Sequence, residues 1–298
     1  MDQLHPSICA RIARALRSLR VLPGWERVVA RLVPADAAGR FVVVNLTGLF
    51  AGDISSFIDR RMYLFGEYER GSIRDFISKI RGDRRGTVLD VGANVGTHSL
   101  AFARHFRQVH AFEPNPNLWE HFERNIALNN LRNLQLHKVG LGDGNAELPF
   151  YLTDRKNYGL GTFSRIEQYD LPLKEVGRLT VVSGDGYIKS AHIGPIDAIK
   201  IDVQGFELEV VRGLADVLEK DRPFVWLEVS ADTIATVQST ESLRELFPFQ
   251  SDLFRFEQHR IGGIFHSMRL RPASPGRLDP GDYLIAPLST DKDRAIVA

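Results

Sequence analysis

The feature that most constrains the fold is a short stretch, Thr87–His98, which reads TVLDVGANVGTH. An apolar and β-branched run reaches Asp90, two glycines four residues apart follow, and Ser99–Ala103 has the composition of a helix. A strand, a tight glycine turn and a helix in this order open a nucleotide-binding α/β unit. The stretch therefore predicts an α/β fold in which a ligand lies at the turn.

Composition limits the class of protein. The 298 residues are 44% apolar, which predicts one large domain, residues 41–298, with a helical N-terminal appendage over residues 1–40. Lys and Arg number 38 against 37 Asp and Glu, so charge gives no drive toward nucleic acid. The single cysteine, Cys9, excludes an internal disulfide and a cysteine-based zinc site, and we interpret it as a small apolar residue on a helix. Without an apolar run of about 18 residues or a signal-peptide stretch, we expect a soluble cytoplasmic protein.

The N-terminal segment, residues 7–33, has apolar residues at helical spacing and arginines between them. Pro23-Gly24 interrupts it, so we expect a second short helix over Trp25–Leu32. Two interpretations are open. The segment is either a helical cap whose arginines face solvent, or a peripheral membrane helix that brings the protein to a lipid-linked partner.

Beyond residue 40, strand patterns alternate with helix patterns, which predicts a mostly parallel, seven-stranded sheet with helices on both faces. The expected strands are Phe41–Leu46, Thr87–Val91, Gln108–Phe112, Leu134–Val139, an edge strand Ala146–Leu152, Leu179–Ser183, Ile196–Asp202, Pro223–Val229 and two near Phe254 and Tyr283. The expected helices are Ile73–Ile80, one from the glycine turn to His105, Pro116–Asn129, Phe206–Arg212 and 232–247. Residues 153–178 lack periodicity, and we expect an irregular loop there that contacts the substrate.

Acidic residues follow most of these strands. Asp90, Glu113, Asp143, Asp202 and Glu228 all fall at or just after a predicted strand end. Ligands of open α/β sheets bind outside the carboxyl ends of the strands. These carboxylates are therefore expected to surround the ligand.

The glycine turn also indicates the charge of its ligand. A dinucleotide turn places glycine at its middle position, but this chain has Asn94 there, and the Asp90 carboxylate would repel a pyrophosphate. S-adenosylmethionine is cationic, lacks phosphate and suits Asp90 together with the turn Gly92–Gly96. Glu113 follows Asp90 at close to the spacing at which a carboxylate binds a ribose diol, and this feature is shared with NAD enzymes. Asp143 either accepts a hydrogen bond from the adenine amino group or is a turn residue.

The chain resembles the FkbM-type S-adenosylmethionine-dependent methyltransferases over roughly residues 60–230. The resemblance rests on four segments: Val88–Gly96, Phe112–Asn115, Gly140–Asp143 and Ile199–Glu207. It implies the Rossmann-like class I methyltransferase fold, S-adenosylmethionine as cofactor, and methyl transfer to a hydroxyl of a sugar, glycolipid, polyketide or related small molecule.

One further element fits the resemblance and one residue departs from it. Gly66-Glu67-Tyr68-Glu69 is similar to the Gly-x-Tyr-Glu element of the family, which implies that Glu69 faces the cofactor; otherwise Glu69 caps the next helix. The family usually has glutamate where this chain has Gln204, which cannot act as a base and is a poorer ligand for a hard divalent cation. We therefore expect no metal.

A hydroxyl acceptor must lose a proton, so a general base is expected near the methyl group. Asp202 is the first candidate; alternatively it orders the next turn or binds Lys200. His98 and Glu228 are the second and third candidates, and each is otherwise structural. Two rival functions remain open at this stage: a dinucleotide-dependent oxidoreductase, and a catalytically silent module that binds S-adenosylmethionine. The acceptor and the oligomeric state are not encoded in any readable motif.

Overall fold

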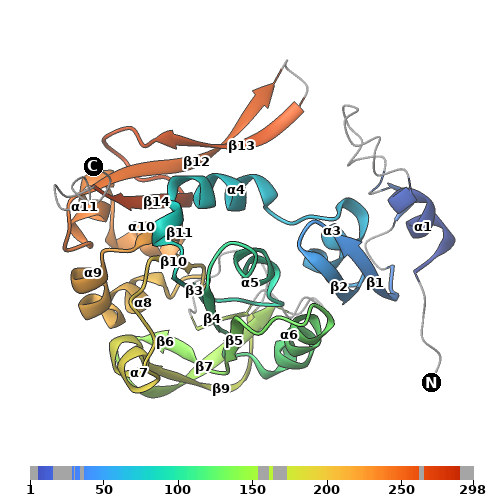
Figure 1. Cartoon of the computed structure of the whole chain (residues 1–298), viewed down its shortest axis with the longest axis horizontal. Helices are drawn as coiled ribbons and strands as arrows, with labels where there is room; N and C mark the ends of the chain where they lie inside the picture. The colour runs from blue at the N-terminus through green and yellow to red at the C-terminus, as the bar shows by residue number, and fades with distance from the viewer. Residues whose placement is uncertain are drawn as a thin grey trace.

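The computed structural model describes residues 6–15, 29, 31–33, 37–153, 161–163, 173–261 and 265–288 (Figure 1). Its helices are α1 Ile8–Ala15, α3 Phe57–Phe65, α4 Arg70–Lys79, η2 Gly82–Arg84, α5 Thr97–Phe102, α6 Pro116–Leu128, α7 Gly184–Ser190, α8 Glu207–Gly213, α9 Ala215–Asp221, α10 Ala231–Thr236 and α11 Thr240–Glu245. Its strands are β1 Arg40–Asn45, β2 Gly48–Asp53, β3 Thr87–Val91, β4 Gln108–Phe112, β5 Leu134–His137, β6 Gly140–Gly142, β7 Ala146–Thr153, β8 Gly161–Thr162, β9 Leu173–Ser183, β10 Ala198–Ile201, β11 Phe224–Val229, β12 Ser251–Ile261, β13 Phe265–Pro272 and β14 Gly281–Pro287.

The central sheet has eight strands in the order β13-β12-β14-β11-β10-β3-β4-β5. The run from β11 to β5 is parallel throughout, whereas β14, β12 and β13 pair antiparallel. The α/β class and the largely parallel centre are as predicted. The eighth strand, β13, was not predicted. It pairs antiparallel with β12 and lies along α4 (Figure 1).

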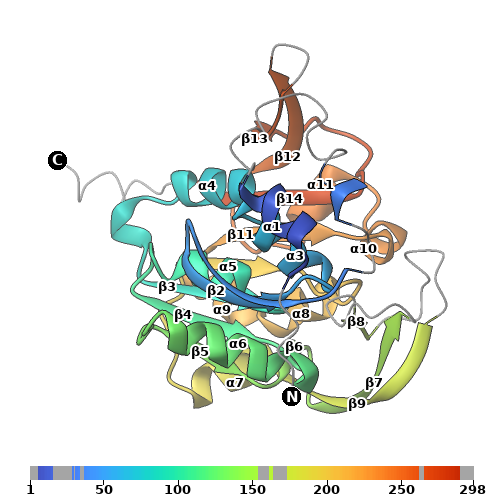
Figure 2. The ribbon, with the colours of Figure 1, turned by 90° about the vertical axis from the view of Figure 1, so that its right-hand side faces the viewer.

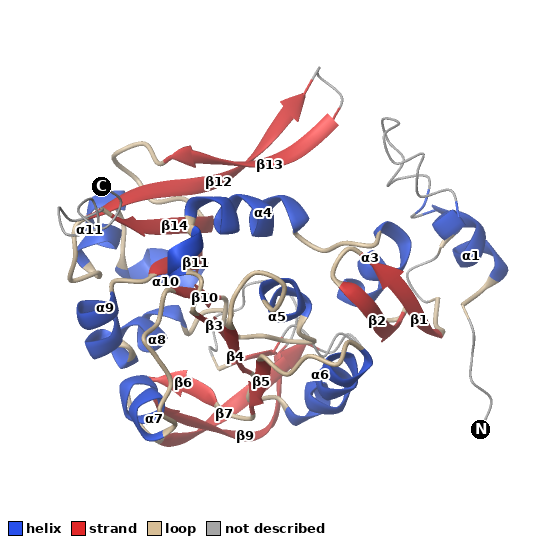
Figure 3. Cartoon of the chain, in the orientation of Figure 1, coloured by secondary structure: helices blue, strands red, loops and turns tan. Residues whose placement is uncertain are grey.

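Alternate residues of the central strands enter two separate cores. Val88 of β3 joins the core under α4, α5 and α6, whereas Leu89 and Val91 join the core under α7, α8 and α9. Figure 3 shows helices on both sides of the sheet. Because a strand alternates with period two, a slip of one residue would turn Leu89, which is fully buried, toward the wrong layer. Asp90 therefore faces the α5 side, as Val88 does.

A second, four-stranded sheet has the order β6-β9-β7-β8. The strand predicted over Ala146–Leu152 is confirmed as β7, but its predicted edge position is wrong, because β7 pairs with β9 on one side and with β8 on the other. The predicted irregular loop 153–178 is also partly wrong, since β8 lies within it and β9 already begins at Leu173. Residues 154–160 and 164–172 lie outside the described residues.

The N-terminal part packs beside the central sheet and does not extend it (Figures 1 and 2). β1 and β2 form a hairpin, and Asn125 of α6 together with the C-cap residue Asn129 completes the hydrogen bonds of the β2 edge. Asn125 accepts from Ala51 N at 2.8 Å, and Asn129 accepts from Leu49 N at 2.8 Å. α1 lies against α3. Most of the second helix expected over 25–32 lies outside the described residues.

The arginine face of α1 is not wholly solvated as the cap interpretation expected. Arg14 donates to the Tyr63 and Val44 carbonyl oxygens, and its guanidinium lies 5.1 Å from the Tyr63 ring centroid. Cys9 lies on α1, as predicted, and is exposed. No described helix is both long and apolar enough to cross a membrane.

The predicted helix 232–247 is two short helices, α10 and α11, with a break at Val237–Ser239. Each begins at a serine cap: the Ser230 side chain accepts from Thr233 N, and the Ser239 side chain accepts from Ser242 N. A second cap within the segment interrupts the helix because its side chain satisfies a backbone N–H that a continuous helix would bond internally.

Candidate functional site

The glycine turn after β3 brings two strand ends together. Gly92 and Gly96 have φ of +82° and +84°, and Asn94 has φ of +54°. A Cβ on Gly92 would lie 1.9 Å from the Asp202 carbonyl oxygen, and one on Gly96 would lie 2.2 Å from the Phe122 ring. These positions need glycine both for backbone conformation and for space. The turn therefore lies directly against the end of β10.

Asp90 lies on β3 just before this turn and is fully buried. Its Oδ2 accepts a 2.5 Å hydrogen bond from Ser99 Oγ at the start of α5. Its Oδ1 is buried and has no hydrogen-bond partner among the described residues. A buried carboxylate oxygen without a partner is costly, so this atom is suited to a ligand that carries hydrogen-bond donors or positive charge.

Glu113 follows β4 and is held by backbone N–H groups on both of its oxygens. Asn94 N donates to Oε2 at 2.9 Å, and Asn115 N donates to Oε1 at 2.8 Å. Burial raises the pKa of this carboxyl to about 7, although the two N–H groups oppose the shift. The carboxyl is thus fixed in place by the glycine turn and by the start of α6, and it can still accept hydrogen bonds from a diol.

A buried lysine organises the end of β10. Lys200 is 2% exposed, and its Nζ donates to Asp202 Oδ2 at 2.9 Å. Gln204 Nε2 donates to Asp202 Oδ1 and to Glu228 Oε2, each at 2.8 Å. Burial raises the pKa of the Asp202 carboxyl, but Lys200 and the hydrogen bonds outweigh burial and leave that pKa below its usual range. Burial and the neighbouring Asp202 charge raise the pKa of Glu228 well above its usual value. Lys200 therefore favours the charged form of Asp202, whereas burial beside that charge favours the protonated form of Glu228.

His98 and Glu69 form a second pair, and Glu69 also interacts electrostatically with Lys200. His98 Nε2 lies 3.0 Å from Glu69 Oε2. The His98 ring packs edge-on against the Trp226 ring, with 5.3 Å between the ring centroids. Burial raises the pKa of Glu69, but His98 and Lys200 outweigh it and lower that pKa overall. Glu69 is the N-cap residue of α4, with φ of +49°, but its side chain makes no capping hydrogen bond. An interaction of its charge with the N-terminal end of α4 stays a prediction.

The sequence did not identify Trp226 or Asp282 as members of this cluster. Trp226 Nε1 donates to Asp282 Oδ1 at 2.9 Å, and Asp282 pairs with Glu228 across β14 and β11. Burial, with the Glu69 charge, raises the pKa of Asp282 to about 6. Asp282 could not be assigned because nothing in its local sequence shows that β14 inserts beside β11. Lys200 entered only as a partner of Asp202, although a lysine within a buried strand is itself a signal.

The predicted residue Asp143 lies apart from these contacts. It is exposed after β6, and its side chain makes no hydrogen bond to any residue of the described ranges. Its role toward an adenine stays a prediction. Within the described ranges, no cluster of three or more His, Cys, Asp or Glu side chains is arranged to hold a metal ion.

The profile of the methyltransferase FkbM domain matches residues 90–256, which is more than half of the chain. The chain belongs to the FkbM methyltransferase family. The match includes Asp90, Glu113, Asp202 and Glu228, whereas Glu69 and Asp282 lie outside it.

Three curated relatives are similar to this FkbM chain. Methyltransferase 1 of Beauveria bassiana is 31% identical over 145 residues, which is 43% of this chain and 58% of the relative. The hexuronic acid methyltransferase AglP of Haloferax volcanii is 28% identical, over 48% of this chain and 56% of the relative. The 2-O-methyltransferase NoeI of Sinorhizobium fredii is 29% identical, over 48% of this chain and 63% of the relative. The chain thus spans less than two thirds of the length of each.

Proposed function

We propose that this chain is an S-adenosylmethionine-dependent methyltransferase that acts on a hydroxyl of a sugar, glycolipid, polyketide or related small molecule. The observation that supports it best is the set of carboxylates at the ends of β3, β4 and β10, within an FkbM domain. They surround a glycine turn whose residues disfavour a bound phosphate. A pyrophosphate would meet Asp90, Glu113 and Asp202 together, which disfavours the dinucleotide-dependent oxidoreductase.

The residues at the turn fit this cofactor. Asp90 Oδ1 has an open acceptor position, which suits the cationic amino acid part of the cofactor. Glu113, at the end of the neighbouring strand, suits the ribose diol. The glycines of the turn Gly92–Gly96 let its backbone approach the cofactor. When bound, S-adenosylmethionine supplies a methyl group on a positively charged sulfur. Asp143 remains the proposed partner of the adenine amino group.

Asp202 is the proposed base. Lys200 keeps its carboxylate ionised at neutral pH, so the carboxylate can accept a hydrogen bond from the acceptor hydroxyl and orient it. A carboxylate with a lowered pKa is a weak base, so it takes the proton only late, once methyl transfer has made the hydroxyl acidic. Asp202 would take the hydroxyl proton as the methyl carbon bonds to the acceptor oxygen, and the broken sulfur–carbon bond would leave a neutral thioether. His98 and Glu228 then serve mainly as supports, for Glu69 and Asp202 respectively.

Gln204 supports this assignment and does not argue for a silent module. Its amide bridges Asp202 and Glu228 with two 2.8 Å hydrogen bonds, so the position that departs from the family keeps the pair together. A glutamate there would offer these carboxylates a donor only in its protonated form. The amide therefore provides at neutral pH the bridge that a charged glutamate could not.

The acceptor class rests on the relatives. The names of AglP and NoeI refer to a hexuronic acid and to 2-O-methylation. We propose a carbohydrate or lipid-linked acceptor on that basis, with no nucleic acid partner. The described part of the N-terminal segment is compatible with membrane contact, because Ile8 and Ile12 of α1 are 73% and 50% exposed.

Calorimetry with S-adenosylhomocysteine and with NAD, in separate titrations, tests the cofactor. We expect S-adenosylhomocysteine to bind and NAD not to bind; the reverse result would overturn the proposal. Turnover of S-adenosylmethionine with a panel of uronic acids, glycolipids and polyketides then tests catalysis. Binding without turnover on any acceptor would favour the silent module.

Asp202→Asn tests the proposed base, because it keeps the shape and removes the charge. We expect turnover to fall by about 10²-fold or more, with S-adenosylhomocysteine affinity changed far less. Unchanged turnover would rule out Asp202 as base. For membrane contact, Ile8→Ser with Ile12→Ser should reduce binding to anionic vesicles, whereas Val176→Ser, at a similarly exposed position on β9, should not.

A further inference from the structure

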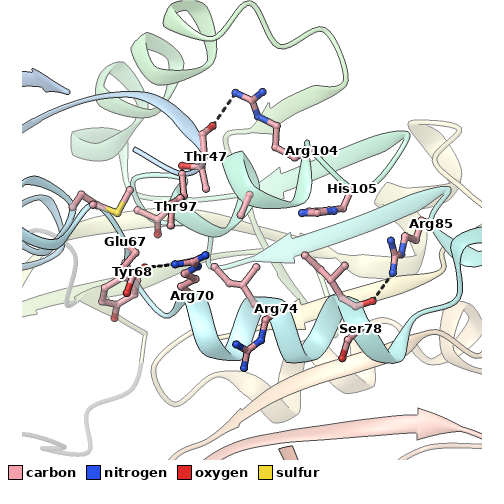
Figure 4. A pocket seen from close by; sticks show the side chains of 16 residues that line it. Thr47, Glu67, Tyr68, Arg70, Arg74, Ser78, Arg85, Thr97, Arg104 and His105 are labelled. Carbon is pink, nitrogen blue, oxygen red and sulfur yellow. Dashed lines mark hydrogen bonds and ion pairs between the residues drawn. The ribbon is translucent and has the colours of Figure 1, made fainter. Parts of the chain in front are cut away.

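A cavity of about 450 Å³ lies on a face of α5 that does not take part in the carboxylate cluster (Figure 4). Thr97 and Ala101 of α5 line it, whereas Ser99 of the same helix contacts Asp90. The remaining walls come from the β1–β2 turn, the end of α3 and the face of α4. This volume is within the range of small-molecule sites, about 300–1,000 Å³.

The inner wall of the cavity is apolar. Met62, Ile73, Ile77 and Ala101 are all buried and all line it. Leu46, which is 62% exposed, stands at the β1–β2 turn, where the apolar wall continues to the surface. A hydrocarbon chain could therefore enter from the side of the hairpin and remain in contact with apolar atoms.

The remaining lining is strongly basic. Four arginines line the cavity, Arg70, Arg74, Arg85 and Arg104, against the single carboxylate of Glu67. Figure 4 shows Arg104 and His105, which follow α5, across the cavity from the α4 residues Arg74 and Ser78.

Two of these arginines have no acidic partner among the described residues. Arg104 donates to the Thr47 carbonyl oxygen at 3.0 Å, and Arg85 donates to the Ile77 and Ile80 carbonyl oxygens. Neither forms an ion pair with a carboxylate of the described residues, whereas Arg70 pairs with Glu67. A guanidinium with free N–H groups beside an apolar wall is suited to a bound phosphate or carboxylate.

We propose that this cavity binds an amphipathic anion, with its alkyl chain against Met62, Ile73 and Ile77 and its phosphate or carboxylate head at Arg104 and Arg85. Tyr68 lines this cavity and also contacts Glu69 and His98, so the cavity borders the proposed cofactor site, but binding of the anion does not depend on methyl transfer. The ligand head could come from a phosphate-bearing lipid or from a fatty acid, because both carry an anion on a hydrocarbon chain.

The proposal is tested by calorimetry on the full chain with decyl phosphate below its micellar concentration, and with decanoate, decanol and inorganic phosphate. We expect decyl phosphate to bind with at least tenfold higher affinity than decanol or inorganic phosphate. Binding of decanoate as well would identify the general anion class, and binding of decyl phosphate alone would identify a phosphate-bearing lipid. Equal affinity for decanol, or no binding of either anion, would overturn the proposal.

Two variants locate the binding. Arg104→Glu, at an exposed position, should weaken decyl phosphate binding by about tenfold or more, whereas Arg107→Glu, just beyond α5 and outside the cavity lining, should not. Ala101→Trp should fill the cavity and abolish binding. S-adenosylhomocysteine affinity in each variant reports folding, so a folded Arg104→Glu variant with unchanged decyl phosphate affinity would refute the site.

Discussion

Replacing Lys200 by methionine would remove the only cation that the structure places against Asp202 among the described residues. Lys200 is 2% exposed, donates to Asp202 at 2.9 Å and lies 5.8 Å from the Trp226 ring centroid. Methionine fills a similar volume, so packing against Trp226 is largely kept. The variant therefore isolates the electrostatic role of the lysine.

The expected loss is about 3–5 kcal/mol in the free energy of unfolding, because one partner of a buried ion pair is left without compensation. For a domain of this size that lowers the melting temperature by roughly 6–20 °C. In the wild type, the lowered pKa of Asp202 contributes stability above pH 3.8 that is lost as pH falls. In the variant, burial is no longer opposed by Lys200 and raises that pKa, so the ionised carboxylate destabilises the fold increasingly as pH rises. The deficit should be larger at pH 8 than at pH 5.

Urea unfolding of both proteins at pH 5 and pH 8 measures this difference. Lys189→Met, at an exposed position of α7, is the matched control and should change stability by no more than about 0.5 kcal/mol. Adding Asp202→Asn to Lys200→Met should recover part of the loss, because the unpaired charge is removed. A loss below about 1 kcal/mol, or an equal loss at both pH values, would refute the role given to Lys200.

Three further outcomes are expected. Gly96→Ala should destabilise by about 2–4 kcal/mol in urea unfolding, since φ is +84° and the new Cβ would meet Phe122, whereas Gly82→Ala has open space and should be nearly neutral. Glu113→Ala should weaken S-adenosylhomocysteine binding at least tenfold in calorimetry, through loss of the diol acceptor. In the wild type, that affinity should fall about tenfold per pH unit below about pH 7, because binding requires Glu113, whose pKa is about 7, to release its proton. An affinity that is flat from pH 5.5 to 7 would contradict the last expectation.

The sequence predicted the parts of the fold that depend on local pattern. The strand–turn–helix unit at Thr87–His98 and α6 were found close to their predicted bounds. The failures occurred where distant segments decide the outcome. Ala146–Leu152 has the alternation of an edge strand, but only pairing with β9 and β8 places it inside a second sheet. The pairing of β12 with β13 likewise joins two segments of which only the first, near Phe254, was predicted as a strand.

The sequence alone determined the family, the glycine turn and the acidic strand ends, because these depend on residue type and on spacing along one chain. Tertiary structure decided how the carboxylates share charge. Lys200 lowers the pKa of Asp202, whereas burial and the Asp202 charge raise the pKa of Glu228, and the antiparallel insertion of β14 brings Asp282 to Glu228. Such differences arise from desolvation and from through-space neighbours, which sequence separation does not record.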